Sequence, residues 1–242
     1  GTARESGCSR ARLMAGILYA IPTSLGGPAP EALPAPALVL IRSLRGFVAE
    51  NAKTARAFLK EIGMPRAMQE LDISTIGTDV SAHIRKLQEG RSIGLLSEAG
   101  CPAIADPGAL LVEAAHREGI RVVPLVGPSS IVLALMASGL EGQRFAFCGY
   151  LPREPEERKR CIKELEARSR RQRETQIFIE TPYRNDALLG SLLEVCAPGT
   201  VLCVASDLTL PSEDIKTRTV AQWRGVRHTI GKRPTVFLML VM

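Results

Sequence analysis

Short apolar runs alternate with amphipathic segments along most of the 242-residue chain, and this order constrains the fold more than any other feature. The run SIGLLSE (92–98) is apolar without alternation, which is typical of a strand whose sheet has helices on both faces. Segments 52–63, 80–90 and 108–119 have apolar residues at helical spacing, and each ends at a glycine. The sequence therefore predicts a parallel sheet with right-handed crossovers.

The alternation starts again after Gly127, which predicts a second domain. In the first half, strands are expected at 16–22, 46–50, 92–98 and 120–126, and helices at 35–44, 52–63, 80–90 and 108–119. In the second half, strands are expected at 144–152, 175–180, 199–207 and 233–241, and helices at 129–139, 154–174 and 184–196. We predict an α/β protein with two α/β domains: an N-terminal parallel sheet (14–127) and a C-terminal mixed sheet (128–242).

Composition limits the function classes. Residues 1–13 are polar, and we expect them to be a disordered leader or a cloning remnant. They contribute three arginines and one glutamate, so the net charge of +6 leaves +4 for the body, which mildly favours a polyanionic partner. The six cysteines lack CxxC spacing and the three histidines are far apart, so we expect no metal site. Reduced thiols and the lack of a long apolar run lead us to expect a cytoplasmic protein.

Three loops rich in glycine and proline follow predicted strands of the first domain, at 22–28, 97–108 and 124–130. Ligands of open parallel sheets bind beyond these strand ends, where glycine permits close approach to the backbone. Glu98 could accept hydrogen bonds from a ribose. Asp106 has two open roles: a ligand contact, or the N-cap of the next helix, which its place ahead of Pro-Gly favours. The lack of GxGxxG and P-loop motifs makes NAD and ATP poor candidates.

Together the loops resemble the tetrapyrrole-methylase family of S-adenosylmethionine-dependent methyltransferases, and within it a branch that methylates small-subunit ribosomal RNA. The matching strings are SEAGCP (97–102), ADPG (105–108), VGPSS (126–130), YAIPTSLGG (19–27) and IETPYR (179–184). The resemblance implies that S-adenosylmethionine binds in a cleft between the two domains. It also implies a homodimer that acts on ribosomal RNA or the small ribosomal subunit. The lack of a long apolar run leads us to expect no membrane partner.

The resemblance also implies which residues bind the methyl donor. They are Pro22, Ser97, Glu98, Ala99, Gly100, Asp106, Val126, Gly127, Pro128, Ser129, Ser130, Tyr150, Thr181 and Thr235. Methyl transfer from a sulfonium is a direct displacement that depends on alignment of the reacting atoms and needs no metal. A ribose hydroxyl acceptor would benefit from a base or a polarising cation. The candidates are Glu50, Lys53, Glu180 and Arg184, and for each the alternative is a surface ion pair.

The chain departs from the ribosomal RNA branch at two places. It has Glu-Asn-Ala-Lys at 50–53, where the branch has Glu-Asp-Thr-Arg, and Ser-Asp-Leu-Thr-Leu at 206–210, where the branch has Arg-Glu-Leu-Thr-Lys. The arginine-rich helix 154–174 is either a solvated face or an RNA-docking face. The leading function is methylation of RNA, at a ribose 2′-oxygen of small-subunit rRNA by resemblance. The alternatives are a methylase of a small molecule such as a tetrapyrrole, and a non-catalytic nucleotide-binding protein.

Overall fold

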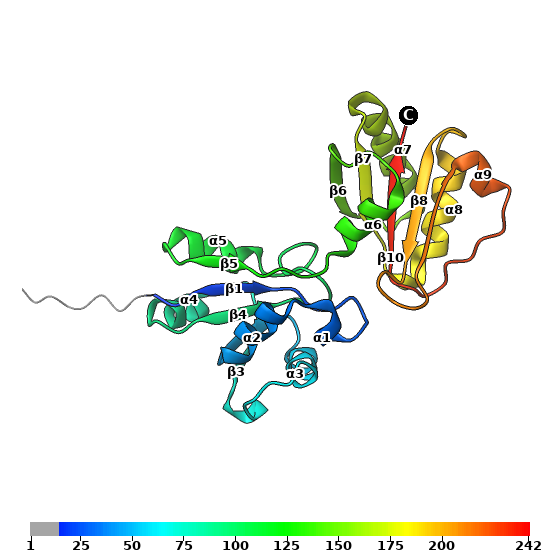
Figure 1. The fold of residues 1–242 in the computed structure, drawn as a ribbon. Helices are drawn as coiled ribbons and strands as arrows, with labels where there is room; N and C mark the ends of the chain where they lie inside the picture. The colour runs from blue at the N-terminus through cyan, green and yellow to red at the C-terminus, as the bar shows by residue number, and fades with distance from the viewer. Residues whose placement is uncertain (1–14) are drawn as a thin grey trace, which may run out of the picture. The chain divides into compact units, whose positions relative to one another are not determined.

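The computed structural model describes residues 15–242, which form two compact units (Figure 1). One unit contains Ala29–Gly127 together with the described residues before Ser24. The other contains Pro128–Met242 and also the short segment Ser24–Pro28. The leader predicted at 1–13 lies outside the described residues.

The first unit is built on a five-stranded parallel sheet with the strand order β3-β2-β4-β1-β5, which confirms the predicted N-terminal parallel sheet. Its strands are β1 (Leu18–Ile21), β2 (Gly46–Ala49), β3 (Asp72–Thr75), β4 (Ile93–Leu96) and β5 (Val122–Pro124). Its helices are α1 (Ala29–Ala32), α2 (Ala35–Ser43), α3 (Ala52–Glu61), α4 (Ser81–Gln88) and α5 (Ala109–Arg117), with a 3-10 turn, η1 (Met68–Glu70).

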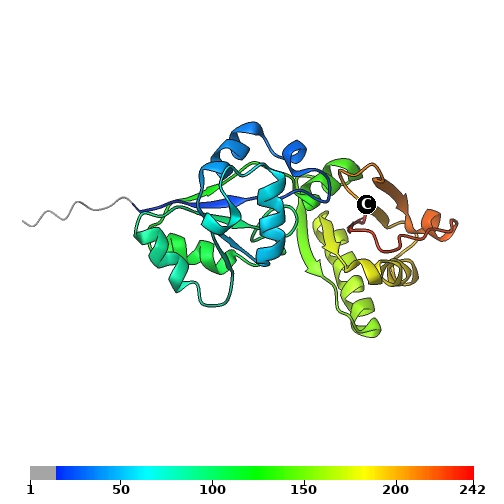
Figure 2. The ribbon, with the colours of Figure 1, turned by 90° about the horizontal axis from the view of Figure 1, so that it is seen from below.

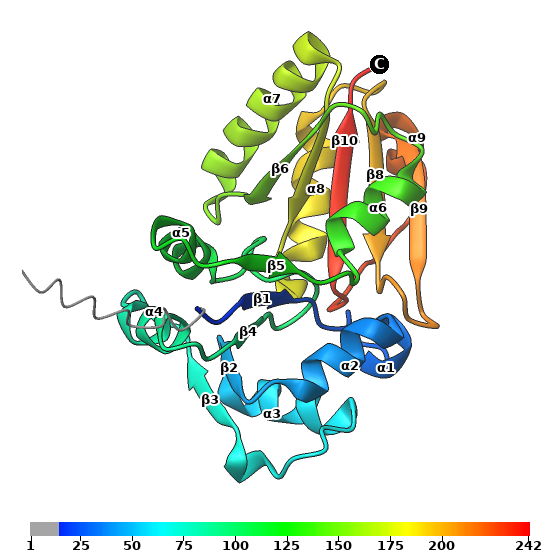
Figure 3. The same cartoon turned by 60° about the vertical axis from the view of Figure 1, so that its left-hand side comes forward.

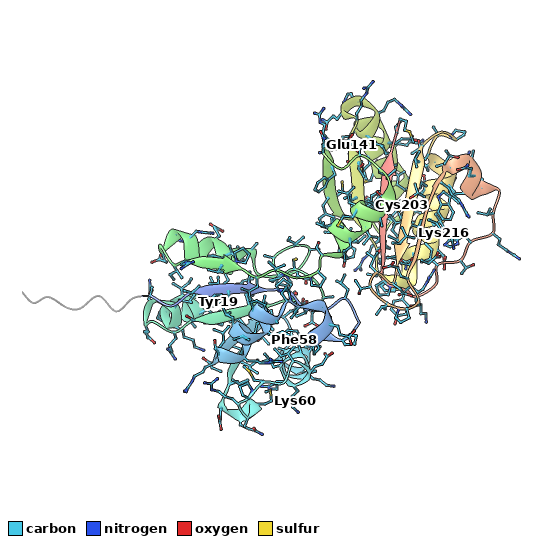
Figure 4. All side chains as sticks on the ribbon, viewed as in Figure 1. Tyr19, Phe58, Lys60, Glu141, Cys203 and Lys216 are labelled. Atoms are coloured by element: carbon cyan, nitrogen blue, oxygen red, sulfur yellow. The ribbon has the colours of Figure 1, made fainter. Side chains whose placement is uncertain are left out.

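Helices cover both faces of this sheet, as the view from below in Figure 2 shows. On one face, Ile21 and Phe47 pack with α2 and α3, including Phe58 (labelled in Figure 4). On the other face, Leu18 and Leu95 pack with α4 and α5. All four residues of β4 are therefore buried, which explains the apolar run without alternation.

The second unit contains a five-stranded mixed sheet with the order β6-β7-β10-β8-β9, which confirms the predicted mixed sheet. The strands are β6 (Phe145–Tyr150), β7 (Thr175–Ile179), β8 (Val201–Ser206), β9 (Asp214–Thr219) and β10 (Thr235–Leu240). Only the β6–β7 pairing is parallel among the described strands of this sheet. The helices are α6 (Ser130–Ser138), α7 (Pro155–Gln172), α8 (Asn185–Val195) and α9 (Val220–Arg224), with a 3-10 turn, η2 (Pro182–Arg184).

Alternate residues of the second sheet point to different helix layers. Cys203 (labelled in Figure 4) and Leu238 pack with α6. Phe178 and Phe237 pack with α7 and α8, and their rings stack with centroids 6.0 Å apart. Figure 3 shows α6 in front of β10 and β8, with α8 behind them. No helix in the described part of the chain combines the length and the apolar character that a membrane span requires.

Two edge strands and two short helices have no counterpart in the sequence prediction. β3 (DIST) and β9 (DIKTRT) are polar, and their residues are mostly half-exposed. Neither strand contains a buried residue, so neither needs a continuous apolar run. α1 and α9 span only four and five residues, too few to show a helical period.

Candidate functional site

The carboxyl ends of β1 and β4 form the switch point of the parallel sheet, because the chain continues from β1 toward β2 and from β4 toward β5, on opposite sides. The loops that follow these strands are joined by an antiparallel bridge between Thr23 and Gly100. The Thr23 N–H donates to the Gly100 carbonyl at 2.9 Å, and the Gly100 N–H donates in return at 3.2 Å. Gly100 has a φ of 77°, which favours glycine at this position.

Buried hydroxyls support this bridge. The Thr23 and Ser97 hydroxyl oxygens lie 3.3 Å apart, and both residues are buried. Ser97 Oγ also donates to the Gly100 carbonyl. The Ser97 side chain therefore holds the loop in shape, while the neighbouring Glu98 and Ala99 are exposed at its surface.

The loop after β5 packs against the loop after β1. The Leu125 N–H donates to the Ala20 carbonyl at 2.8 Å. A Cβ atom at Gly127 would lie 2.5 Å from Pro22 Cβ and 3.0 Å from Leu33 Cδ2, so only glycine fits there. Three of the predicted ligand loops of the first unit are thus brought together through their backbones.

The loop after β2 meets the loop after β4 through side chains. Glu98 Oε1 accepts a hydrogen bond of 2.6 Å from Thr54 Oγ1, in the first turn of α3. Asn51 caps that helix by accepting from the Lys53 N–H at 2.9 Å. The Glu50 and Lys53 side chains are exposed at the same end of the sheet.

The prediction that Asp106 caps α5 is wrong. The N-cap of α5 is Gly108, whose φ of 137° is accessible to glycine but not to a capping side chain, and no side chain caps this helix. The Asp106 carboxyl instead accepts a hydrogen bond from the Glu98 backbone. Its Oδ2 atom is buried and has no hydrogen-bond partner among the described residues.

The surroundings of Asp106 oppose its ionisation. Burial raises the pKa of the Asp106 carboxyl, and the charges of Glu50 and Glu98 raise it further. These three carboxylates gather where β2 and β4 end, although the described residues include no His, Cys, Asp or Glu group arranged to hold a metal ion. An acidic, partly desolvated corner therefore lies beside the bridged loops.

Asp106→Asn is expected to raise the melting temperature at pH 7 by about 1 to 3 °C. Because the folded-state pKa of Asp106 is raised, ionisation costs stability as the pH rises through that value. The gain should therefore grow from pH 4 to pH 8 in thermal unfolding scans, and Glu118→Gln, which changes an exposed carboxylate elsewhere in this unit, should show no such trend. A gain that is constant with pH would contradict the assignment.

In the second unit, Glu180 and Arg184 form an ion pair. Arg184 Nη2 lies 2.5 Å from Glu180 Oε1, and the Thr181 N–H donates to the same oxygen at 2.6 Å. Burial of Glu180 favours its neutral form, but the hydrogen bonds from Arg184 and Thr181 outweigh burial and lower the pKa of this carboxyl. The hydrogen bond to Glu180 in turn raises the pKa of Arg184, with a smaller contribution from nearby Tyr150.

Asn185 belongs to the same cluster and was missed by the sequence analysis. It is fully buried, and its Nδ2 donates to the carbonyls of Gly231 at 3.1 Å and Arg233 at 2.7 Å. Thr235 lies beside it and shares a 2.9 Å hydrogen bond with Ser206. The only sequence signal for Asn185 is its position directly after the IETPYR string.

The remaining predicted ligand residues divide between the two units. Val126 is exposed in the first unit. Pro128, Ser129 and Ser130 belong to the second unit, where the Ser129 hydroxyl caps α6 by accepting from the Val132 N–H at 3.5 Å. The Tyr150 ring is exposed at the end of β6.

The fold, a parallel sheet followed by a mixed sheet, is shared with solved methyltransferases. The structure titled "Crystal structure of the methyltransferase CobJ" aligns over 93% of this chain and 94% of that chain, with a TM-score of 0.61 and 17% identity. The uroporphyrin-III-C-methyltransferase from Thermus thermophilus aligns over the same shares, with a TM-score of 0.56 and 21% identity. These likenesses define the fold.

The family follows from sequence. The profile described as "Tetrapyrrole (Corrin/Porphyrin) Methylases" matches residues 26–223, and the chain belongs to this family of methyltransferases. Relatives named "Ribosomal RNA small subunit methyltransferase I" are similar over most of their length. The relative from Xylella fastidiosa is 34% identical, and the match covers 84% of this chain and 73% of the relative. The relative from Bacillus subtilis is also 34% identical, and the match covers 86% of this chain and 68% of the relative. The predicted resemblance is confirmed, and methyltransferases of this family use S-adenosylmethionine as the methyl donor.

Proposed function

We propose that this chain binds S-adenosylmethionine and transfers its methyl group to RNA, with a ribose 2′-hydroxyl of small-subunit rRNA as the acceptor. The observation that carries the proposal is the Thr23–Gly100 bridge at the switch point, with Gly127 packed against Pro22. These contacts fix a backbone-lined site next to carboxylates, which suits a nucleoside. The names of the relatives support RNA as the acceptor.

We assign donor contacts mainly to the backbone of the joined loops. The hydroxyls of Ser97, Ser129 and Thr235 already hydrogen bond within the protein. The exposed Glu98 carboxylate is available to accept hydrogen bonds from a ribose or from the donor's ammonium group, and the buried, unpartnered Oδ2 of Asp106 lies close to it. Bound S-adenosylmethionine would supply the electrophilic methyl group, and the protein would hold it in line with the acceptor.

The four catalytic candidates differ in what their surroundings allow. Glu180 has a lowered pKa and a fixed partner, so it is a poor general base and better suited to orienting Arg184. Glu50 and Lys53 are exposed at the ligand end of the first sheet, where they can reach an acceptor. We assign Lys53 to the stabilisation of negative charge on the acceptor, with Glu50 as the candidate base.

We also propose that the enzyme is a cytoplasmic homodimer. An enzyme that modifies ribosomal RNA works where ribosomes are assembled. The exposed apolar residues Val132 and Met136, one turn apart on α6, are consistent with a surface covered by a second copy.

Two measurements test the proposed function. Calorimetry should show that S-adenosylmethionine or its demethylated product binds, with NAD and ATP much weaker. Tritiated methyl groups should then enter small-subunit rRNA from cells that lack the enzyme. A flat titration with donor and product would exclude methyl transfer. If the donor binds but the label enters only a small molecule, the chain is a small-molecule methylase. If the donor binds and no substrate is labelled, the chain is a non-catalytic nucleotide-binding protein.

A further inference from the structure

The second unit contains a basic stretch whose charged residues are not used by the proposed donor site. Residues 215–235, which run from β9 through α9 to the start of β10, include no Asp or Glu. The stretch contains Lys216 (labelled in Figure 4), Arg218, Arg224, Arg227, Lys232 and Arg233. We call these six residues, together with Tyr183, the basic face.

The loop of the basic face is held in a defined shape. Asp186, in the first turn of α8, accepts from the Ile230 N–H at 2.7 Å and from the Gly231 N–H at 3.1 Å. Asn185 binds the same loop through two carbonyls, and Ile230 is buried in the core. Trp223 of α9 is buried, and its ring nitrogen donates to the Leu202 carbonyl at 3.0 Å. Little conformational entropy is therefore lost when this loop binds a ligand.

Most of the positive charge of the basic face is not neutralised. Lys216 and Arg233 lie within 4 Å of Asp207 or Asp214. Among the described residues, Arg218, Arg224, Arg227 and Lys232 have no carboxylate within ion-pair distance. Arg224 donates to the carbonyls of Leu193 and Cys196, and Arg218 lies over the Trp223 ring. Arg227 and Lys232 are exposed, and their charges are available to phosphate groups.

An exposed aromatic ring adjoins the cations. Tyr183 is 79% exposed, and the Lys232 ammonium lies 4.9 Å from its ring centroid. A ring exposed to this degree offers a surface on which an unpaired base can stack, next to a cation for the adjoining phosphate. Cations combined with an aromatic ring favour single-stranded nucleic acid over an acidic protein.

Helix α7, the other basic segment, is less suited to this role. Arg158 is buried and donates to Ser191 Oγ at 3.0 Å. Lys159 pairs with two glutamates, and Arg168 pairs with Glu174. The remaining cations of α7, such as Arg170 and Arg171, are exposed without a neighbouring exposed ring on the same helix, which contains no aromatic residue.

We propose that the basic face binds an unpaired segment of the RNA substrate, with Arg227 and Lys232 on phosphates and Tyr183 stacked on a base. This inference rests on the proposed function in one respect: the proposed function identifies the bound polyanion as the RNA substrate. The basic face serves substrate docking and takes no part in donor binding.

The test uses the full chain and a fluorescently labelled fragment of small-subunit rRNA. Arg227→Ala combined with Lys232→Ala should weaken RNA binding at least tenfold and make the slope of log affinity against log salt shallower by about 1.5. The matched control, Arg170→Ala with Arg171→Ala, removes the same charge from α7 and should change both quantities much less. Affinity for S-adenosylmethionine should stay at the wild-type value in both variants.

A second pair of variants tests the ring. Tyr183→Ala should weaken RNA binding about five- to hundredfold, whereas Tyr183→Phe should retain it, because phenylalanine keeps the stacking surface. Equal binding by wild type and both variants would remove Tyr183 from the surface. If the Arg227 and Lys232 variant binds RNA like wild type, the basic face is not the docking surface and the proposed function stands. If wild type binds the donor but no RNA at low salt, both proposals fail.

Discussion

Gly127→Ala is expected to weaken S-adenosylmethionine binding by at least tenfold and to destabilise the protein by about 1 to 3 kcal/mol. The added Cβ would lie 2.5 Å from Pro22 Cβ and 2.8 Å from Pro22 Cγ, distances that real Cβ atoms essentially never show. The proline ring is rigid, so relief must come from movement of the backbone. That backbone leads directly into Thr23, which forms the bridge to Gly100.

Gly94→Ala is the matched control for this prediction. A Cβ at Gly94 would lie 2.5 Å from Ile21 Cδ1 and 2.9 Å from Phe47 Cδ1, so overpacking occurs within the sheet, against side chains. We expect a similar loss of stability with a much smaller loss of donor affinity, measured by calorimetry at a temperature where both variants are folded. Equal losses of affinity would show that Gly127 acts only through global stability.

Sequence patterns predicted the apolar strands of each sheet, because burial on both faces constrains every residue of such a strand. The fully buried β4 and β8 produce uninterrupted apolar runs, and the helices beside them end at glycines such as Gly63 and Gly139, which have positive φ. Strands β3 and β9 contain no buried residue and lack that constraint, so their sequences resemble loops. The switch-point loops were predictable because glycine and proline cluster after strands only where backbone geometry demands them.

The roles of individual polar residues were less predictable, because tertiary contacts decide them. Asp-Pro-Gly before a helix is a normal capping signal, yet the Asp106 carboxyl turns to the Glu98 backbone, 8 positions earlier in the sequence. Ser97 and Thr235 were predicted to contact ligand, and their hydroxyls support the fold. Glu180 and Arg184 were predicted as separate catalytic candidates, although their spacing of four residues is also typical of an ion pair.

Arg184→Ala is expected to lower the melting temperature by roughly 5 to 10 °C at pH 7, because it leaves Glu180 buried without its partner. Arg117→Ala is the matched control, since Arg117 pairs with Glu113 at the same spacing but both side chains are more than 60% exposed. A change of less than about 2 °C is expected there. A melting temperature for Arg184→Ala equal to that of wild type would contradict the structural role of the pair.

The pH dependence of the melting temperature shows whether Arg184→Ala acts by removing the Glu180–Arg184 ion pair or only by removing packing contacts of the arginine. The pKa of Glu180 lies below its ordinary value of 4.5, so the pair contributes stability above that pH and loses it as the pH falls through the folded-state pKa. In Arg184→Ala, burial acts without the arginine and raises the pKa of Glu180. The gap in melting temperature between wild type and variant should therefore be widest near pH 7 and narrow toward pH 4.

Glu180→Gln combined with Arg184→Ala then distinguishes the structural role of Arg184 from a role in the reaction. The double variant buries no charge at this position, so it should recover most of the stability lost in Arg184→Ala. If methyl transfer recovers with stability, Arg184 serves only to neutralise Glu180. If stability returns while transfer to RNA stays low and donor affinity is unchanged, the guanidinium itself acts on the acceptor, because only the step after donor binding has then been lost.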